Sequence, residues 1–118
     1  MRRAFVVEDR KYVRELIVAF INHTKKFSHV DEAESGEGAL AIFKPGVYGL
    51  VVIDIGLINM TGLDVCIEMR KLDPDTTIFA ISGHVDLLKN NDFSIAGFDA
   101  WFTKPTGYKD FFDAVRDL

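Results

Sequence analysis

The 118-residue chain has a single cysteine, only three prolines and no long hydrophobic run. Cys66 cannot form an internal disulfide, and its neighbours Leu63, Val65 and Met69 predict a plain core thiol. No apolar stretch approaches the roughly 20 residues that a membrane-spanning helix needs, and no signal-peptide pattern opens the sequence. We therefore expect a cytoplasmic protein that does not insert into a membrane.

The chain also lacks an excess of basic residues. Its formal net charge is −4, and no basic stripe is present, which argues against direct binding of nucleic acid. A hydrophobic share of 48% with 27% charged residues is typical of a folded protein, and the length suits one domain covering residues 1–118. These values argue against disorder and favour a single domain for this sequence.

Short apolar segments alternate with amphipathic ones along the whole chain. The predicted strands are Ala4–Val7, a weaker Phe27–Ala33, Leu50–Ile53, Thr77–Ile81 and Ala100–Thr103. The predicted helices are Lys11–Thr24, Ala39–Phe43, Thr61 to about Lys71, about Val85 to Ala96, and Tyr108 to the end. Alternation of this kind predicts a doubly wound α/β domain, flavodoxin-like, with a five-stranded parallel sheet in the order 2-1-3-4-5 and five helices.

The spacing of apolar residues in three helices also predicts which side chains face the core. The predicted inward residues are Val13, Leu16, Ile17, Phe20 and Ile21 in the first helix, Leu63, Cys66, Ile67 and Met69 in the third, and Leu87, Leu88 and Ile95 in the fourth.

Polar residues follow four of the strands where each strand ends. Glu8-Asp9, Asp54, Ser82 and Lys104 occupy these positions. The carboxyl ends of parallel strands meet at one edge of the sheet, so these groups should converge there. Three carboxylates at such close range repel one another unless a hard divalent cation lies between them, and oxygen ligands suit Mg²⁺. With a lysine nearby and a hydroxyl that can donate to a phosphoryl oxygen, the set favours phosphoryl transfer to a carboxylate.

The motifs at these strand ends form a specific set. They are Val6-Val7-Glu8-Asp9, Val52-Ile53-Asp54-Ile55, Gly62, Ile81-Ser82-Gly83, and Ala96-Gly97 through Trp101-Phe102-Thr103-Lys104-Pro105. Over essentially its whole length the chain resembles the receiver domains of two-component response regulators. Departures are Ile58, where the family commonly has proline, and Gly56, whose lack of a side chain leaves an acyl phosphate unscreened.

The resemblance implies a role for each site residue. Asp54 is the implied phosphoacceptor, which takes its phosphoryl group from a phosphohistidine on a partner kinase. Asp9, Asp54 and the backbone carbonyl of Gly56 are the implied Mg²⁺ ligands, with Glu8 assisting, often through water. Lys104 is implied to pair with the phosphoryl oxygens.

Two further residues are implied to act as the switch. Ser82 supplies the hydroxyl that moves towards the phosphoryl group, and Trp101 stands where receivers usually carry a switch tyrosine or phenylalanine. Packing of a half-buried ring at a sheet edge would also explain Trp101. His84 is either a residue that tunes dephosphorylation or a solvated residue at a helix start.

The resemblance further implies partners. These are a sensor histidine kinase or a histidine phosphotransfer protein upstream, and a target protein or a missing output domain downstream. The surface formed by the fourth helix, the fifth strand and the fifth helix would bind the downstream partner, or a second copy of the chain in a homodimer. A free-standing receiver and a receiver within a longer protein both remain open.

Three alternatives stand beside this interpretation. A Mg²⁺-dependent phosphatase with an aspartate nucleophile usually has a second aspartate two residues after the first, where this chain has Gly56. A flavodoxin-type electron carrier needs a phosphate-cradling loop after the first strand, where Glu8-Asp9-Arg10 places acids. A degenerate receiver would act as an interaction module without phosphorylation.

Overall fold

The fold is built from five parallel strands in one sheet. The computed structural model describes residues 1–83 and 90–118, and within them the strand order is β2-β1-β3-β4-β5. The strands are β1 Arg3–Val7, β2 Val30–Ala33, β3 Tyr48–Asp54, β4 Ile78–Ser82 and β5 Ala100–Thr103. The helices of the described residues are α1 Lys11–Thr24, α2 Gly36–Ile42, α3 Gly62–Leu72, α4 Asn90–Ala96 and α5 Tyr108–Arg116. The predicted flavodoxin-like α/β fold is confirmed.

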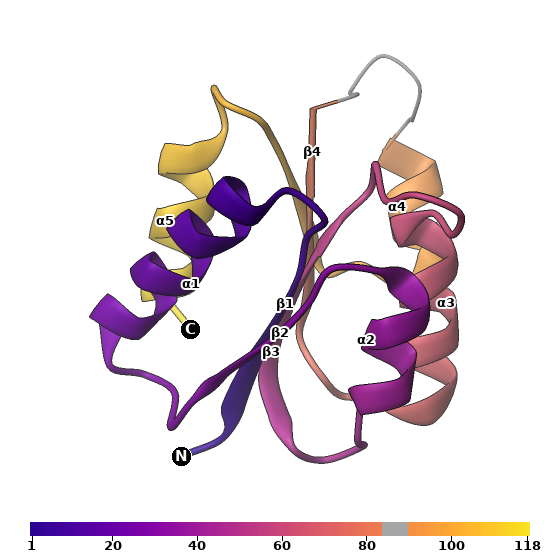
Figure 1. Ribbon diagram of the computed structural model, residues 1–118, viewed down its shortest axis with the longest axis horizontal. Helices are drawn as coiled ribbons and strands as arrows, with labels where there is room; N and C mark the ends of the chain where they lie inside the picture. Colours follow the sequence, from indigo (N-terminus) through magenta and orange to yellow (C-terminus); the bar gives the residue numbers. More distant parts are fainter. Residues whose placement is uncertain (84–89) are drawn as a thin grey trace.

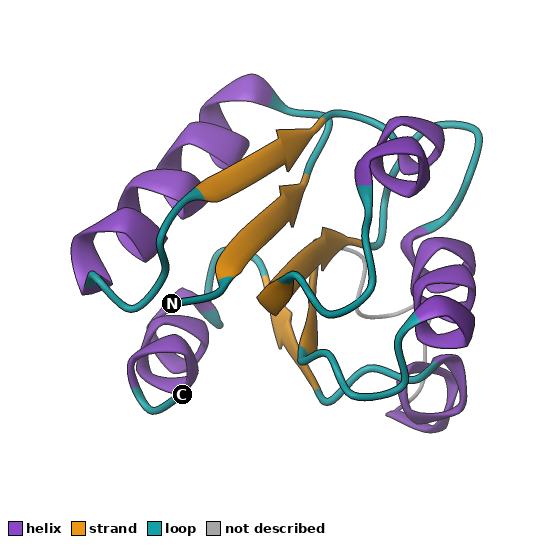
Figure 2. Cartoon of the chain, turned by 90° about the horizontal axis from the view of Figure 1, so that it is seen from below, coloured by secondary structure: helices purple, strands orange, loops and turns teal. Residues whose placement is uncertain are grey.

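The helices cover both faces of the sheet. Helices α1 and α5 lie on one face, and α2, α3 and α4 lie on the other (Figures 1 and 2). Each face has its own hydrophobic core, one around Phe5, Ile53 and Met69 and the other around Ile17 and Phe111. The central strands are buried on both sides, which explains why they appear in the sequence as continuous apolar runs.

The predicted element boundaries are confirmed for α1 and β5, and differ for α2. Helix α2 begins at Gly36, three residues before the predicted Ala39. Ser35 is its N-cap, and the hydroxyl of Ser35 accepts a hydrogen bond from the backbone N–H of Gly38 at 3.0 Å. Such a cap satisfies an amide that the first turn leaves unpaired, so the helix starts earlier than the apolar pattern indicates.

Three side chains that were predicted to face the core are exposed. Leu16 is 49% exposed, Ile67 38% and Ile95 75%. An α-helix rotates by about 100° per residue, which turns each of these side chains away from the buried stripe of its own helix. Leu87 and Leu88 lie outside the described residues.

Cys66 is fully buried, as predicted, and burial raises the pKa of its thiol to about 12. Within residues 1–83 and 90–118, no helix is both long and apolar enough to span a bilayer.

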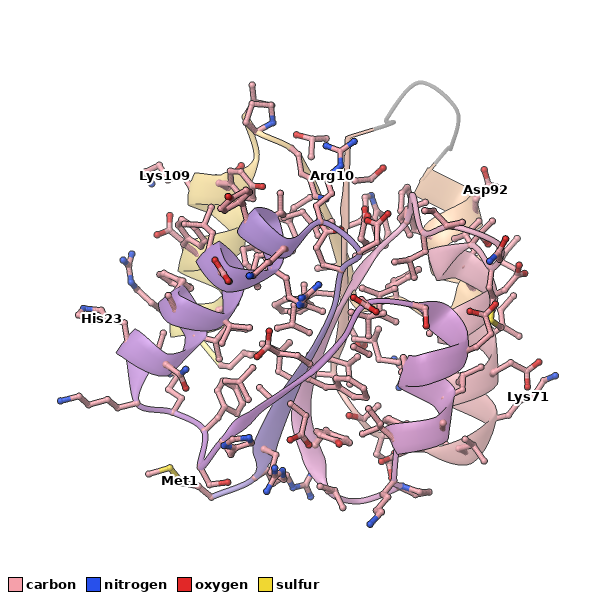
Figure 3. All side chains as sticks on the ribbon, in the orientation of Figure 1. Met1, Arg10, His23, Lys71, Asp92 and Lys109 are labelled. Carbon is pink, nitrogen blue, oxygen red and sulfur yellow. The ribbon has the colours of Figure 1, made fainter. Side chains whose placement is uncertain are left out.

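The two ends of the parallel strands carry different residues. Figure 3 shows Arg10 at the end where the strands finish, and Met1 at the opposite end. The residues that follow β1, β3, β4 and β5 therefore share one edge of the molecule, as parallel strands require.

Candidate functional site

Three carboxylates converge at the ends of the two central strands β1 and β3. Val7 pairs with Ile53 in the sheet, so the next residues, Glu8 and Asp54, lie side by side. Carboxylate oxygens of Glu8, Asp9 and Asp54 all lie within 4.8 Å of one another. Glu8 is fully buried and Asp54 is only 5% exposed. The sequence-predicted acidic cluster is thus present.

Lys104 joins this cluster from the edge strand β5. Its Nζ lies 2.5 Å from Oε1 of Glu8 and 3.2 Å from Oδ1 of Asp54. The backbone N–H of Lys104 donates to the carbonyl oxygen of Ser82 at 2.8 Å, which anchors the residue to the end of β4. The long side chain then reaches across β4, and one ammonium group contacts two of the three carboxylates.

Burial and neighbouring charges shift the pKa of both partners. Burial and the neighbouring Asp54 raise the pKa of Glu8, Lys104 opposes both effects, and the net result is a pKa of about 7. Burial lowers the pKa of Lys104, but its contacts with Glu8 and Asp54 outweigh burial and hold this pKa above its ordinary value. The ammonium group therefore stays charged at neutral pH, whereas Glu8 titrates near neutrality.

Backbone amides orient two of the carboxylates. The N–H of Gly56 donates to Oδ1 of Asp54 at 3.2 Å, and the N–H of Arg10 donates to Oε2 of Glu8 at 3.4 Å. Hydrogen bonds of this kind favour the charged form of a carboxylate and restrict its rotation.

A small cavity lies beside Asp54. Its volume is about 60 Å³, and it is lined by Asp9, Arg10, Asp54, Gly56, Gly83 and Lys104. Pockets for organic ligands usually exceed about 300 Å³, so this cavity suits an ion or a phosphoryl group rather than an organic substrate.

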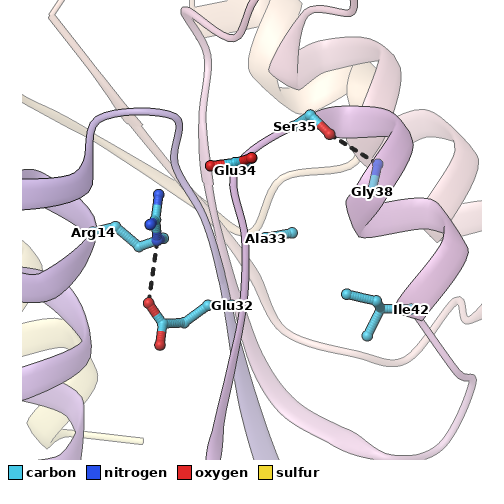
Figure 4. A pocket seen from close by; sticks show the side chains of 7 residues that line it. All are labelled: Arg14, Glu32, Ala33, Glu34, Ser35, Gly38 and Ile42. Carbon is cyan, nitrogen blue, oxygen red and sulfur yellow. Dashed lines mark hydrogen bonds and ion pairs between the residues drawn. The ribbon is translucent and has the colours of Figure 1, made fainter.

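A larger pocket lies elsewhere on the described residues. It measures about 480 Å³, is wide open to solvent and lies between α1, the end of β2 and α2 (Figure 4). Its lining includes Arg14, Glu32, Glu34 and Ser35 but not Asp54. The perturbed pKa of Glu8 and the clustered charges locate the candidate site at the smaller cavity.

The two sequence-predicted switch residues lie at different positions along their strands: Ser82 ends β4, whereas Trp101 of β5 pairs with Ala80, two residues earlier in β4. Ser82 is the last residue of β4, is 2% exposed and is bonded through its backbone to Lys104. Trp101 is half-buried on β5, and its ring stacks on Phe93 of α4 with a centroid distance of 5.3 Å and an interplanar angle of 10°. The tryptophan therefore contacts α4. His84 lies outside the described residues.

The donor atoms fit a hard divalent cation. Oxygen ligands from three carboxylates, beside a cavity large enough for bound water, are the set that Mg²⁺ prefers. Because Asp9 and Asp54 line the cavity and Glu8 is not among its lining residues, Asp9 and Asp54 are the better placed pair for direct ligation.

Three residues near the site were not predicted from the sequence. Arg10 and Gly83 line the cavity, and Arg14 binds the backbone carbonyl of Glu8. The adjacency of Arg10 to the acidic pair was a usable signal. Arg14 carries no such signal, because an arginine in the first turn of a helix is most often solvated.

Comparison with known proteins identifies the class. The fold and the acidic edge are those of a response regulator receiver domain, and the model of that family matches residues 4–116. The chain belongs to this family. It is thus a receiver domain of two-component signalling, a class of signalling switches rather than conventional enzymes.

Relatives of this domain occur alone and within longer proteins. The chain is 39% identical over 103 residues to the aerobic respiration control sensor protein ArcB of Escherichia coli, a match covering 85% of the chain and 13% of ArcB. It therefore spans only a small part of that relative. It is also 26% identical over 117 residues to the chemotaxis protein CheY of Halobacterium salinarum, covering 99% of the chain and 96% of CheY.

Solved structures agree with the fold. The response regulator TrrA of Thermotoga maritima, in complex with Mg²⁺ and BeF, has a TM-score of 0.83 and 28% identity, covering 99% of this chain and 98% of TrrA. TrrA has also been solved in complex with the histidine kinase ThkA, with a TM-score of 0.81 and coverage of 99% and 97%.

Proposed function

We propose that this receiver domain is a Mg²⁺-dependent phosphorylation switch with Asp54 as the phosphoacceptor. The observation that carries the proposal is the contact of one ammonium group, on Lys104, with both Glu8 and Asp54 inside the three-carboxylate cluster. This arrangement provides a nucleophile, a cation site and a positive charge around a cavity of phosphoryl size.

The reaction transfers a phosphoryl group from nitrogen to oxygen. A carboxylate oxygen of Asp54 attacks the phosphorus of a phosphohistidine, the P–N bond breaks, and the electron pair leaves with the imidazole nitrogen. Asp9 and Asp54, with Glu8 assisting and the Gly56 carbonyl adjacent, would hold Mg²⁺, which when bound would supply positive charge to the phosphoryl oxygens. The product is an acyl phosphate on Asp54.

Lys104 is placed to contact Asp54 in its phosphorylated form as well as in its unphosphorylated form. Its Nζ lies 3.2 Å from Oδ1 of Asp54, within reach of an oxygen of a phosphoryl group attached there. The Ser82 hydroxyl has a matching role as donor to a second phosphoryl oxygen. Movement at the end of β4 then alters the Trp101–Phe93 contact and biases the position of α4.

The proposed upstream partner is a histidine kinase or a histidine phosphotransfer protein. The solved complex of the structural relative TrrA with the kinase ThkA supports this choice. The proposed downstream partner is a target protein or an output domain that binds the surface of α4, β5 and α5, and the same surface is the proposed site of homodimerisation. A cytoplasmic location is part of the proposal.

The test is the intact mass of the protein after incubation with acetyl phosphate, with and without Mg²⁺. We expect a gain of one phosphoryl group that requires Mg²⁺ and is absent in Asp54→Asn. Histidine kinase autophosphorylated with labelled ATP supplies the second donor, to detect a receiver that accepts only from its kinase. A folded protein that gains no phosphoryl group from either donor would favour the degenerate receiver. Steady hydrolysis of an aryl phosphate would favour the phosphatase.

A further inference from the structure

The guanidinium of Arg14 connects the acidic site to β2, a strand at the edge of the sheet. Arg14 lies in the first turns of α1, and its side chain is only 15% exposed. Its Nη1 donates to the backbone carbonyl oxygen of Glu8 at 2.9 Å, and its Nε donates to Oε1 of Glu32 at 3.2 Å. Figure 4 shows the second contact at the wall of the large pocket.

The carbonyl of Glu8 lies where the ladder between β1 and β2 ends. The N–H of Glu8 donates to the carbonyl of Ala33 at 3.0 Å, and Ala33 is the last residue of β2. Beyond this point the chain turns from the strand into α1, and the bond from Arg14 holds the Glu8 carbonyl there. At Glu8, the residue before Asp9, the Arg14 side chain therefore takes the place of a neighbouring strand as the hydrogen-bond donor to the backbone carbonyl.

This bond fixes the orientation of Asp9. The Glu8 carbonyl and the Asp9 N–H belong to one planar peptide unit, so a fixed oxygen also fixes the direction in which the Asp9 backbone begins. Glu32 in turn holds the guanidinium against β2, and the fork of an arginine makes both bonds at once. Glu8 and Asp9 are two of the three acidic residues of the proposed Mg²⁺ site.

We propose that Arg14 is a positioning residue that orients the Glu8–Asp9 peptide for cation binding. The inference rests on the proposed Mg²⁺-dependent function and extends it to a residue that never contacts the ion. Groups that orient metal ligands commonly change metal affinity by about 10- to 100-fold when they are removed.

A purely electrostatic role for Arg14 predicts the opposite result. A positive charge near the cluster repels a divalent cation, so its removal would tighten binding. A positioning role predicts weaker binding when the two bonds are lost, whether or not the charge remains. The sign of the change in Arg14→Met therefore separates the two roles.

The experiment is calorimetric titration of the metal-free protein with Mg²⁺. We expect Arg14→Met and Arg14→Lys both to weaken Mg²⁺ binding by about tenfold, because lysine keeps the charge but cannot make both bonds. Glu32→Ala should cause a smaller loss, since the bond to Glu8 remains. Either Arg14 variant suffices if the other fails to fold.

The matched control is Arg3→Met. Arg3, the first residue of β1, also pairs with a carboxylate of β2, that of Asp31, at the end of the strands opposite to Glu8. Its loss should cost stability but leave the Mg²⁺ affinity within about twofold of the wild type, because distant sites behave independently.

The outcomes separate this inference from the proposed function. Unchanged or tighter binding in Arg14→Met, with a wild type that binds Mg²⁺, overturns the positioning role alone. A wild type that binds no Mg²⁺ overturns both. A second readout uses no metal: ¹⁵N relaxation should show larger motion of the Asp9 amide in both Arg14 variants than in Arg3→Met, and equal order there overturns the inference.

Discussion

Gly62 lies so close to Asp54 that a Cβ at residue 62 would be 2.5 Å from the Asp54 carbonyl oxygen and 2.8 Å from the Cα of Ile55. The N–H of Gly62 also donates to the carbonyl of Ile55 at 3.1 Å. The start of α3 is thereby packed directly against the residue proposed as phosphoacceptor. Only glycine permits this approach, which gives a physical reason for a glycine downstream of Asp54.

Gly62→Ala should destabilise the protein by about 1–2 kcal/mol. The higher helix propensity of alanine contributes at most about 1 kcal/mol in its favour. The new Cβ would contact backbone atoms that cannot move as a flexible side chain can, and overpacking of this kind costs about 1–3 kcal/mol. Urea unfolding followed by circular dichroism measures the change. Gly83→Ala is the control, since a Cβ there meets nothing within 4 Å, and an equal loss in both variants would contradict the steric explanation.

Mg²⁺ should bind more weakly as the pH falls below 7. Burial and Asp54 raise the pKa of Glu8 to about 7 in the metal-free protein, so below that pH a proton competes with the cation for the acidic cluster. A single competing proton of this pKa makes the affinity about tenfold lower at pH 6 than at pH 8. Calorimetry at these two pH values, in buffers of different ionisation enthalpy, also counts the proton released. An affinity independent of pH would contradict the assignment.

Glu8 should also make the metal-free protein less stable as the pH rises. Its pKa is raised from 4.5 to about 7 on folding, so the folded state binds the proton more tightly than the unfolded state. The associated stability is present below about pH 4.5 and is lost as the pH rises through 7. We expect a decrease of about 2 kcal/mol between pH 5 and pH 8 without Mg²⁺. The decrease should be absent in Glu8→Gln, and a slope that persists in this variant would point to another group.

Lys104→Met should have opposite effects on cation binding and on phosphorylation. Without the ammonium group of Lys104, no positive charge of the protein is paired with Glu8 and Asp54 in this contact. Mg²⁺ should therefore bind several-fold more tightly at pH 8.5. The rate of phosphorylation by acetyl phosphate should fall by about 10- to 100-fold, because a charge that stabilises the transferring oxygens is lost. Titration calorimetry and intact mass measure the two effects. A parallel loss of both would instead indicate a collapsed site. Lys109→Met, which removes a surface lysine paired with Asp113, is the control.

The fold and the position of the site were predictable because both follow from a simple regularity. Alternating apolar and amphipathic segments have few topological solutions, and parallel strands bring their carboxyl ends to one edge. Residue types at those ends were therefore enough to predict the cluster of Glu8, Asp9, Asp54 and Lys104.

Other features depend on contacts that sequence spacing does not encode. Glu8 was expected at the site, but its full burial against Lys104 was not, because this contact requires a side chain to cross β4. The exposure of Ile95 depends on the rotation of α4 about its own axis. The bond from Arg14 to the Glu8 carbonyl depends on where β2 ends. Tertiary geometry decides each of these.

The stack of Trp101 on Phe93 offers an optical readout of the proposed switch. Trp101 is the chain's only tryptophan, so the tryptophan fluorescence of the protein reports on this ring alone. The rings are nearly parallel at 5.3 Å, and Phe93 also contacts Phe98 edge to face at 5.9 Å. If phosphorylation alters the contact between β5 and α4, acetyl phosphate with Mg²⁺ should shift the emission of the wild type but not of Asp54→Asn.

Phe93→Leu should shift the emission without phosphorylation and destabilise the protein by about 1 kcal/mol through the lost aromatic pair. Phe98→Leu should cost similar stability while leaving the emission unchanged, because its ring is stacked edge to face on Phe93 rather than on the indole. An emission insensitive to phosphorylation in a protein shown to carry the acyl phosphate would exclude Trp101 from the switch and leave packing as its role.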